Sequence, residues 1–63
     1  MIQADPIRLR FLRNYRGLTQ TELAAKAGLS RASVNYAEKG DKVQLLTLQK
    51  IADALKCRVN YLT

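Results

Sequence analysis

The sequence contains no histidine, a single cysteine (Cys57) and a single proline. Histidine is the side chain that most often transfers protons near neutral pH, and zinc fingers bind their metal through cysteine and histidine. One thiol forms no internal disulfide and is typical of a reducing compartment. These absences exclude zinc fingers and histidine-based acid–base catalysis, and we expect no cofactor and no metal site.

Long apolar runs are also missing. No stretch approaches the roughly 20 apolar residues that a membrane-spanning helix needs. The first residues contain no basic segment followed by an apolar one, so we expect no signal peptide. A cytoplasmic protein that does not engage a membrane is therefore predicted.

Positive charge is what the chain has in excess. Its 63 residues include eleven Lys or Arg against five Asp or Glu, a formal net charge of +6. A chain of this length forms one small domain, residues 1–63, whose core supplies only about 3–5 kcal/mol. At 48% hydrophobic residues, it is too apolar for a disordered basic tail. The charge indicates a polyanionic partner, with nucleic acid ahead of an anionic membrane surface.

Capping residues and glycines divide the chain into short helices. Asp5 followed by Pro6 predicts a helix start, and Gly17 suits the residue just after a helix end. Thr19 and Glu22 have the spacing of a capping box. The predicted helices span residues 7–16, 20–27, 31–39 and 48–56.

The remaining boundaries follow from single residues. Ser30 and Thr47 are the predicted N-caps of the third and fourth helices, and residues 41–46 form a connector. Residues 60–63 could add one more turn. Because no segment alternates with period two for long enough to be a strand, the predicted fold class is all-α, a compact domain of four to five helices.

The two predicted helices within residues 20–39 are joined by only three residues, and they contain a set of residues at characteristic spacing. These residues are Gln20, Leu23-Ala24, Ala27-Gly28-Leu29-Ser30, Val34 and Ala37-Glu38-Lys39-Gly40. So short a link, with a glycine in it, makes the helices cross steeply. The stretch resembles the helix-turn-helix of the lambda-repressor/Cro-like family, and the resemblance extends over nearly the whole chain without a gap.

The resemblance implies sequence-specific binding of double-stranded DNA by a prokaryotic, phage or plasmid transcriptional regulator. One such module has little contact area, so we expect a homodimer, at least on DNA, at a palindromic operator. A cytoplasmic protein, nucleoid-associated or encoded by a phage or plasmid, is expected. Phage-type repressor, restriction–modification controller and antitoxin are roles that the resemblance does not separate. We predict no small-molecule ligand.

The second helix of the pair would lie in the major groove, with Arg31, Ala32, Ser33 and Tyr36 toward the bases. The guanidinium of Arg31 matches guanine O6 and N7. Helical spacing separately places this face opposite Val34 and Ala37. The implied phosphate contacts are Gln20, Ser30, Asn35, Lys39 and Lys42. A partly buried ring stays open as the alternative for Tyr36. For Asn35 the favoured interpretation is an ordinary solvent-facing amide.

Other residues are predicted to act in the fold. The family often pairs an arginine of the first helix with the glutamate that closes the third, so Arg13 and Glu38 are the expected structural ion pair. The resemblance implies that Cys57 falls at a core position of the family, so it is predicted to be a small buried apolar residue. Lys56 stands where the family usually has glycine, so that turn needs another cap or is strained. No acid, base and nucleophile constellation indicates an enzyme.

An apolar stripe of Ile7, Phe11 and Tyr15 lies at spacing four in the first helix. The favoured interpretation is a satellite core against the turn of Tyr61 and Leu62. The other is an interface with another chain. In that case the alternative function is a protein-interaction module of the same fold, for example an antitoxin-like protein that binds its partner through this stripe.

Overall fold

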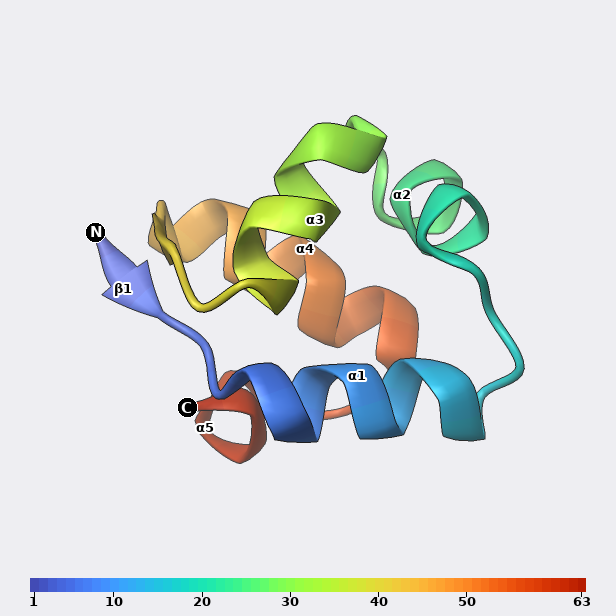
Figure 1. The fold of residues 1–63 in the computed structure, drawn as a ribbon, viewed down its shortest axis with the longest axis horizontal. Helices are drawn as coiled ribbons and strands as arrows, with labels where there is room; N and C mark the ends of the chain where they lie inside the picture. Colours follow the sequence, from blue (N-terminus) through green and yellow to red (C-terminus); the bar gives the residue numbers. More distant parts are fainter.

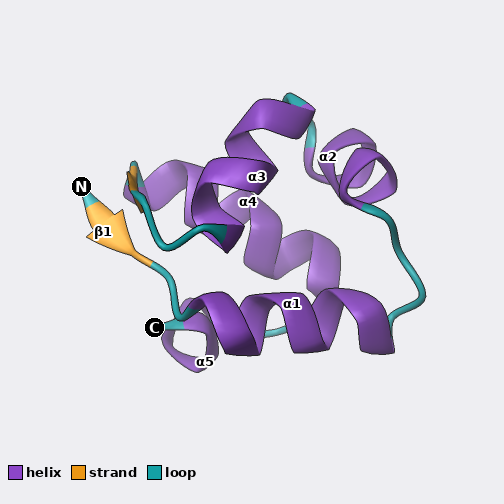
Figure 2. Cartoon of the chain, in the orientation of Figure 1, coloured by secondary structure: helices purple, strands orange, loops and turns teal.

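The computed structural model describes all residues from Met1 to Thr63 and contains five helices and a two-stranded sheet (Figures 1 and 2). The elements are β1 (Ile2–Gln3), α1 (Pro6–Tyr15), α2 (Gln20–Ala27), α3 (Arg31–Glu38), β2 (Lys42–Val43), α4 (Leu45–Leu55) and α5 (Val59–Leu62). In Figure 1, α1 runs along one side of the molecule and α2 and α3 lie across from it. None of the helices has the length and apolar character to cross a membrane.

The first two helices begin at the caps that the sequence predicts. Oδ1 of Asp5 accepts hydrogen bonds from the N–H groups of Ile7 and Arg8, at 3.0 and 3.2 Å. At the start of α2, the N–H of Thr19 donates to Oε1 of Glu22 (2.9 Å). The N–H of Glu22 donates back to Oγ1 of Thr19 (3.1 Å), which completes the capping box. Gly28 ends α2 in the left-handed conformation, with a φ of +69°.

The later helices depart further from the prediction. Helix α3 begins after its predicted N-cap Ser30, whose Oγ accepts from the N–H of Ser33 (3.2 Å), and ends one residue early. The prediction that Thr47 caps α4 is wrong, because α4 begins at Leu45 and Thr47 lies in its first turn. The carbonyl of Gln44 accepts from the N–H of Leu48 (3.2 Å), so helical bonding starts one turn before the predicted cap.

The expectation that no strand forms is also wrong. Ile2 of β1 pairs with Val43 of β2, and Gln3 pairs with Lys42, in antiparallel register. Nε2 of Gln3 also donates to the carbonyl of Gly40 (2.5 Å). Two residues are too few to show an alternating pattern, and the partners are about 40 residues apart. This short sheet holds the N-terminal segment against the end of α3.

The core consists of thirteen buried apolar residues, and every helix contributes to it. They are Ala4, Leu9, Leu12, Leu23, Ala24, Val34, Ala37, Val43, Leu48, Ile51, Ala52, Leu55 and Leu62. Cys57 packs against this core, as predicted for a small apolar residue, but it is only partly buried. Its partial burial raises the pKa of the thiol.

The end of α4 is strained. Lys56 adopts φ 58° and ψ 47° and is the one non-glycine residue with a positive φ. A side chain in this left-handed conformation costs about 1 kcal/mol, because its Cβ crowds the following carbonyl. Of the two outcomes expected where the family has glycine, the chain therefore has the strained turn.

The favoured interpretation of the apolar stripe on α1 is wrong. Ile7, Phe11 and Tyr15 are 75%, 60% and 71% exposed, so they form no satellite core. Leu62 is fully buried in the main core instead. Helix α1 already fills its inner face with Leu9 and other core residues, and the stripe lies on the opposite side of the helix.

Candidate nucleic-acid interface

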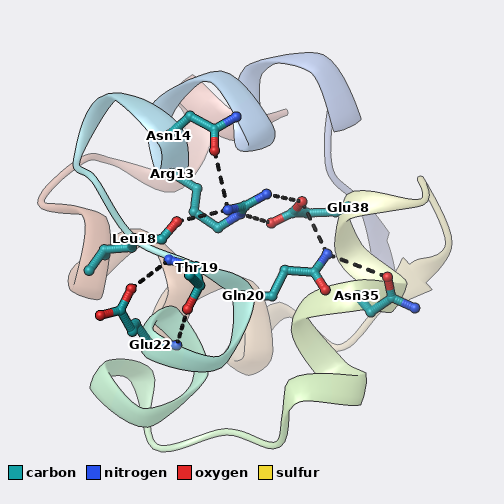
Figure 3. A network of polar contacts seen from close by, with 8 residues as sticks. All are labelled: Arg13, Asn14, Leu18, Thr19, Gln20, Glu22, Asn35 and Glu38. Atoms are coloured by element: carbon teal, nitrogen blue, oxygen red, sulfur yellow. Dashed lines mark hydrogen bonds and ion pairs between the residues drawn. The ribbon is translucent and has the colours of Figure 1, made fainter.

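A partly buried ion pair joins α1 to the end of α3 (Figure 3). Nε of Arg13 donates to Oε2 of Glu38 (2.5 Å), and the second guanidinium contact, to Oε1, is 3.1 Å long. A third donor of Arg13 reaches the carbonyl of Leu18 (2.7 Å). Glu38 is the one buried charged residue of the chain. The two-pronged geometry fixes where α3 sits relative to α1, as the sequence led us to expect.

Two of the residues expected at phosphates belong to the same network. Nε2 of Gln20 lies 3.3 Å from Oε1 of Glu38 and 3.4 Å from Oδ1 of Asn35, and it donates to both. Gln20 and Asn35 are half-buried, so the favoured interpretation of Asn35 as a freely solvated amide is wrong. Figure 3 shows the side chains of Gln20, Asn35 and Glu38 converging with that of Arg13 between the start of α2 and the end of α3. The network therefore ties both helices of the helix-turn-helix to one carboxylate.

The start of α2 retains hydrogen-bond donors. The first backbone N–H groups of a helix have no partner within it, and those of Gln20 and Thr21 point out of the N-terminus. The side-chain donors of Gln20 are engaged with the network, so in this conformation an anion would meet the backbone donors first. The carboxylate of Glu22 stands at the same end, and its hydrogen bonds to Thr19 lower its pKa.

The outer face of α3 is open to solvent along its length. Arg31 and Ala32 are exposed, whereas Val34 and Ala37 are completely buried against the rest of the domain. Arg31 makes no side-chain hydrogen bond and no ion pair, so all of its guanidinium donors are free. The helix thus separates a core face from a face that can contact a partner.

The rest of this face is polar, and some of its side chains contact one another. The hydroxyls of Ser30 and Ser33 lie 3.1 Å apart and share a hydrogen bond. Tyr36 is 51% exposed, so its side chain is accessible to a partner. Nζ of Lys39 lies 5.6 Å from the centre of the Tyr36 ring. Such a contact holds the ammonium beside the aromatic face without neutralising it.

Cations continue beyond the end of α3. Lys39 is the C-cap residue of α3, and Lys42 follows in β2 with its side chain exposed. Neither lysine forms an ion pair. Arg31, Lys39 and Lys42 thus follow one another in sequence along α3 and the segment after it, and no carboxylate is bonded to any of them.

Two arginines with structural roles were missed by sequence reasoning. Nε of Arg16 donates to the carbonyl of Leu55 (3.0 Å) and ties the end of α1 to the end of α4. Arg8 contacts the carbonyl of Tyr61 (3.3 Å) and lies over its ring. These contacts join residues 39 and 53 positions apart, so no local pattern could have indicated them.

The comparisons with known proteins agree with this geometry. The HTH_3 helix-turn-helix family model matches residues 9–62. The chain belongs to the HTH_3 helix-turn-helix family. No curated protein sequence matches it. The resemblance to lambda-repressor/Cro-like proteins and the predicted all-α fold class are therefore confirmed.

Solved structures of regulators have the same fold. The restriction–modification controller protein C.AhdI from Aeromonas hydrophila is 39% identical with a TM-score of 0.84, over 92% of this chain and 89% of that one. An HTH_3 family transcriptional regulator from Vibrio cholerae is 32% identical with a TM-score of 0.77, over 89% and 32% of the two chains. The clp gene regulator ClgR from Corynebacterium glutamicum is 28% identical with a TM-score of 0.77, over 87% and 60%. The last two relatives are longer than this chain.

Proposed function

We propose that this HTH_3 protein is a transcriptional regulator that reads a specific double-stranded DNA sequence with α3 in the major groove. The observation that carries the proposal is the open outer face of α3, with Arg31 unpaired, above a core face that is completely buried. The partly buried pair of Arg13 and Glu38 supports α3 as a rigid reading element. Membership of the HTH_3 family and the regulators of similar structure support the same function.

Base recognition is assigned to the first part of α3. Arg31 offers a planar fork of donors that matches guanine O6 and N7, and it has no internal partner to give up. Ala32 has only a methyl group, so it can contact a thymine methyl or leave space. Ser33 and Tyr36 each present a hydroxyl on the same face. Sequence preference is therefore expected to be strongest where Arg31 meets the groove.

Phosphate contacts would surround the reading face. The free N–H groups at the start of α2 next to Gln20 suit an anion, and Ser30 and Asn35 lie at the edges of α3. Lys39 and Lys42 would add attraction that does not depend on sequence. These contacts set the position of α3 in the groove.

A dimer would supply the area that one copy lacks. A single module of this kind buries roughly 600–1,000 Å² on DNA, which is small for high specificity. Two copies related by a two-fold axis would place their α3 helices about 34 Å apart, one turn of the duplex. The operator would then be a palindrome.

The similarity to C.AhdI favours one of the possible regulatory roles. It covers nearly the full length of both chains, whereas the other two regulators are longer. We therefore propose control of a restriction–modification system as the role to examine first. Genes for a nuclease and a methyltransferase next to the coding sequence would support this role, and a locus without them would oppose it.

Salt dependence tests the DNA contact directly. We expect the chain to bind a random duplex, and its affinity to fall at least about tenfold between about 50 and 200 mM salt as released counterions compete. The double variant Lys39→Ala, Lys42→Ala should show a shallower salt slope. An affinity that is independent of salt would refute phosphate contact.

A further inference from the structure

The α1 stripe, consisting of Ile7, Phe11 and Tyr15, has no partner within the chain. Its three side chains are 60–75% exposed, and the rings of Phe11 and Tyr15 stack on each other with centres 6.1 Å apart. We infer that this stripe is a docking surface for an amphipathic helix of another protein, with acidic residues flanking the apolar face of that helix. This inference goes beyond the proposed DNA function and does not depend on it.

The charge around the stripe identifies the kind of partner. Arg8 lies 5.6 Å from the centre of the Tyr61 ring, and Arg16 lies 5.7 Å from that of Tyr15. Arg10 is exposed and unpaired. The stripe therefore has a rim of three arginines. The carboxylate of Asp5, which caps α1, lies 3.8 Å from Arg8 and is the one that forms an ion pair with the rim.

Two of the three rim arginines, Arg8 and Arg16, are held in place before any partner arrives. Nε of Arg16 is bonded to the carbonyl of Leu55, and one terminal nitrogen of Arg8 to the carbonyl of Tyr61. Each guanidinium keeps further N–H donors free for a carboxylate. A carboxylate that binds them would pay little of the usual entropy cost of ordering a long side chain. Fixed cations beside an apolar strip match an acidic amphipathic helix.

A second copy of this chain fits the surface poorly. Two copies face to face would bring two rims of arginines together in a protein that already carries a net charge of +6. A stable dimer buries about 800 Å² per partner, about a fifth of the 4001 Å² of this chain, and three side chains on a ten-residue helix supply less. The same limit on area indicates a partner that binds reversibly.

DNA bound to α3 would leave the stripe free. Arg13 points from α1 toward Glu38 of α3, and the stripe lies on the opposite side of α1. Figure 1 likewise shows one side of α1 turned toward the other helices and one side turned out. The partner and DNA can therefore occupy the protein at the same time.

Three designed peptides test the inference on the whole chain. Each is a 16-residue helix with the same leucine and phenylalanine face, flanked by glutamate, glutamine or lysine. Fluorescence anisotropy should give at least tenfold tighter binding of the glutamate peptide than of the glutamine peptide, and no binding of the lysine peptide. Phe11→Ser should weaken the glutamate peptide at least tenfold. Leu46→Ser is the matched control, because Leu46 is similarly exposed (58%) but lies on α4, and it should change nothing.

Several results would overturn the inference. Equal affinity for the glutamate and glutamine peptides would remove the role of the arginine rim. An equal loss in the Phe11→Ser and Leu46→Ser variants would show that binding is not at the stripe. Self-association that Phe11→Ser abolishes would assign the surface to a second copy, and binding to anionic vesicles without binding to the peptide would assign it to a membrane. Each readout can be taken without DNA, so it stands apart from a failure to bind DNA.

Discussion

The outer faces of α1 and α3 differ in a way that net charge does not reveal. Helix α1 and its C-cap carry four of the arginines, yet Arg8, Arg13 and Arg16 are all bonded to carbonyl or carboxylate oxygens of the chain itself. Helix α3 carries only Arg31, whose donors are free. The α3 face is small and polar, whereas the α1 face is apolar. Three of the four arginines of α1 and its C-cap are bonded within the chain, whereas the one arginine of α3 is not, so the number of arginines alone does not distinguish the proposed DNA face.

The largest effect on stability should come from breaking the ion pair between Arg13 of α1 and Glu38 of α3. Arg13→Met leaves the carboxylate of Glu38 buried without its cation, and we expect a loss of about 3 kcal/mol in the free energy of unfolding. In a domain of this size the thermal midpoint should fall by at least about 10 °C. Circular dichroism melting measures the shift.

Two controls keep that result specific. Arg10→Met removes an exposed, unpaired arginine from the same helix and should leave the thermal midpoint within a few degrees of the parent. Replacing both partners, Arg13→Met with Glu38→Leu, should recover much of the loss, because no charge is then left buried. Equal midpoints for Arg13→Met and the parent would contradict the structural role of the pair.

A smaller effect, confined to one face, should follow from Arg31→Ala. Losing the two bonds to a guanine should weaken specific binding about 10- to 100-fold and leave binding to random duplex nearly unchanged. Gel-shift titrations on a specific and a random duplex measure both affinities. Lys50→Ala removes a cation from α4 and should leave the ratio of the two affinities as it is. A parallel loss on both duplexes would mean that Arg31 contacts only phosphates.

A substitution at the end of α4, away from the outer faces of α1 and α3, should increase the free energy of unfolding instead of lowering it. Lys56→Gly relieves the left-handed conformation and should stabilise the domain by about 0.5–1 kcal/mol, with both binding surfaces unchanged. Lys56→Ala removes the same charge but keeps the Cβ, so it should give no such gain. Urea unfolding of the three proteins decides the matter, and a gain in the alanine variant would point to charge rather than backbone strain.

The smallest effect concerns Glu22, which lies in the first turn of α2, the helix between α1 and α3. Its pKa is lowered by hydrogen bonds from Thr19, so its ionised form stabilises the fold above its unfolded pKa. That contribution is lost as the pH falls through the lower, folded pKa. Glu22→Gln should therefore be less stable than the parent at neutral pH, and the difference should shrink below about pH 4.5.

Urea midpoints at pH 7 and at roughly pH 3 measure the Glu22 effect. The same substitution in a Thr19→Ala background provides the control, because the capping box is already broken there. If the pH-dependent difference persists in the Thr19→Ala background, the effect of Glu22 on stability does not arise from the capping box.

How well the sequence predicts the structure depends on the range of each interaction. Asp5, Thr19 and Ser30 cap their helices through bonds to residues two or three positions away, so the boundaries of α1 and α2 and the start of α3 could be predicted. The start of α4 could not, because Thr47 has the residue type of a cap while the helix begins after Gln44. The sheet was missed because Ile2 and Val43 pair across most of the chain.

The candidate site shows the same division. Helical spacing indicated which face of α3 is exposed, and the family resemblance indicated the pair of Arg13 and Glu38. Neither could indicate that Gln20 turns its amide toward Glu38 or that Arg8 lies over Tyr61, because these contacts depend on how the helices are placed in three dimensions. The apolar stripe at Ile7, Phe11 and Tyr15 was seen in the sequence, but its exposure required the position of α5.

Selection from a randomised duplex pool tests the central claim most directly. The claim is that α3 reads a DNA sequence, and that two copies do so together. The account predicts enrichment of a palindrome whose half-sites lie about one helical turn apart, with one position in each half-site relaxed when Arg31→Ala is used for selection. A pool that shows no enriched sequence after repeated rounds, although the protein binds DNA, would contradict it.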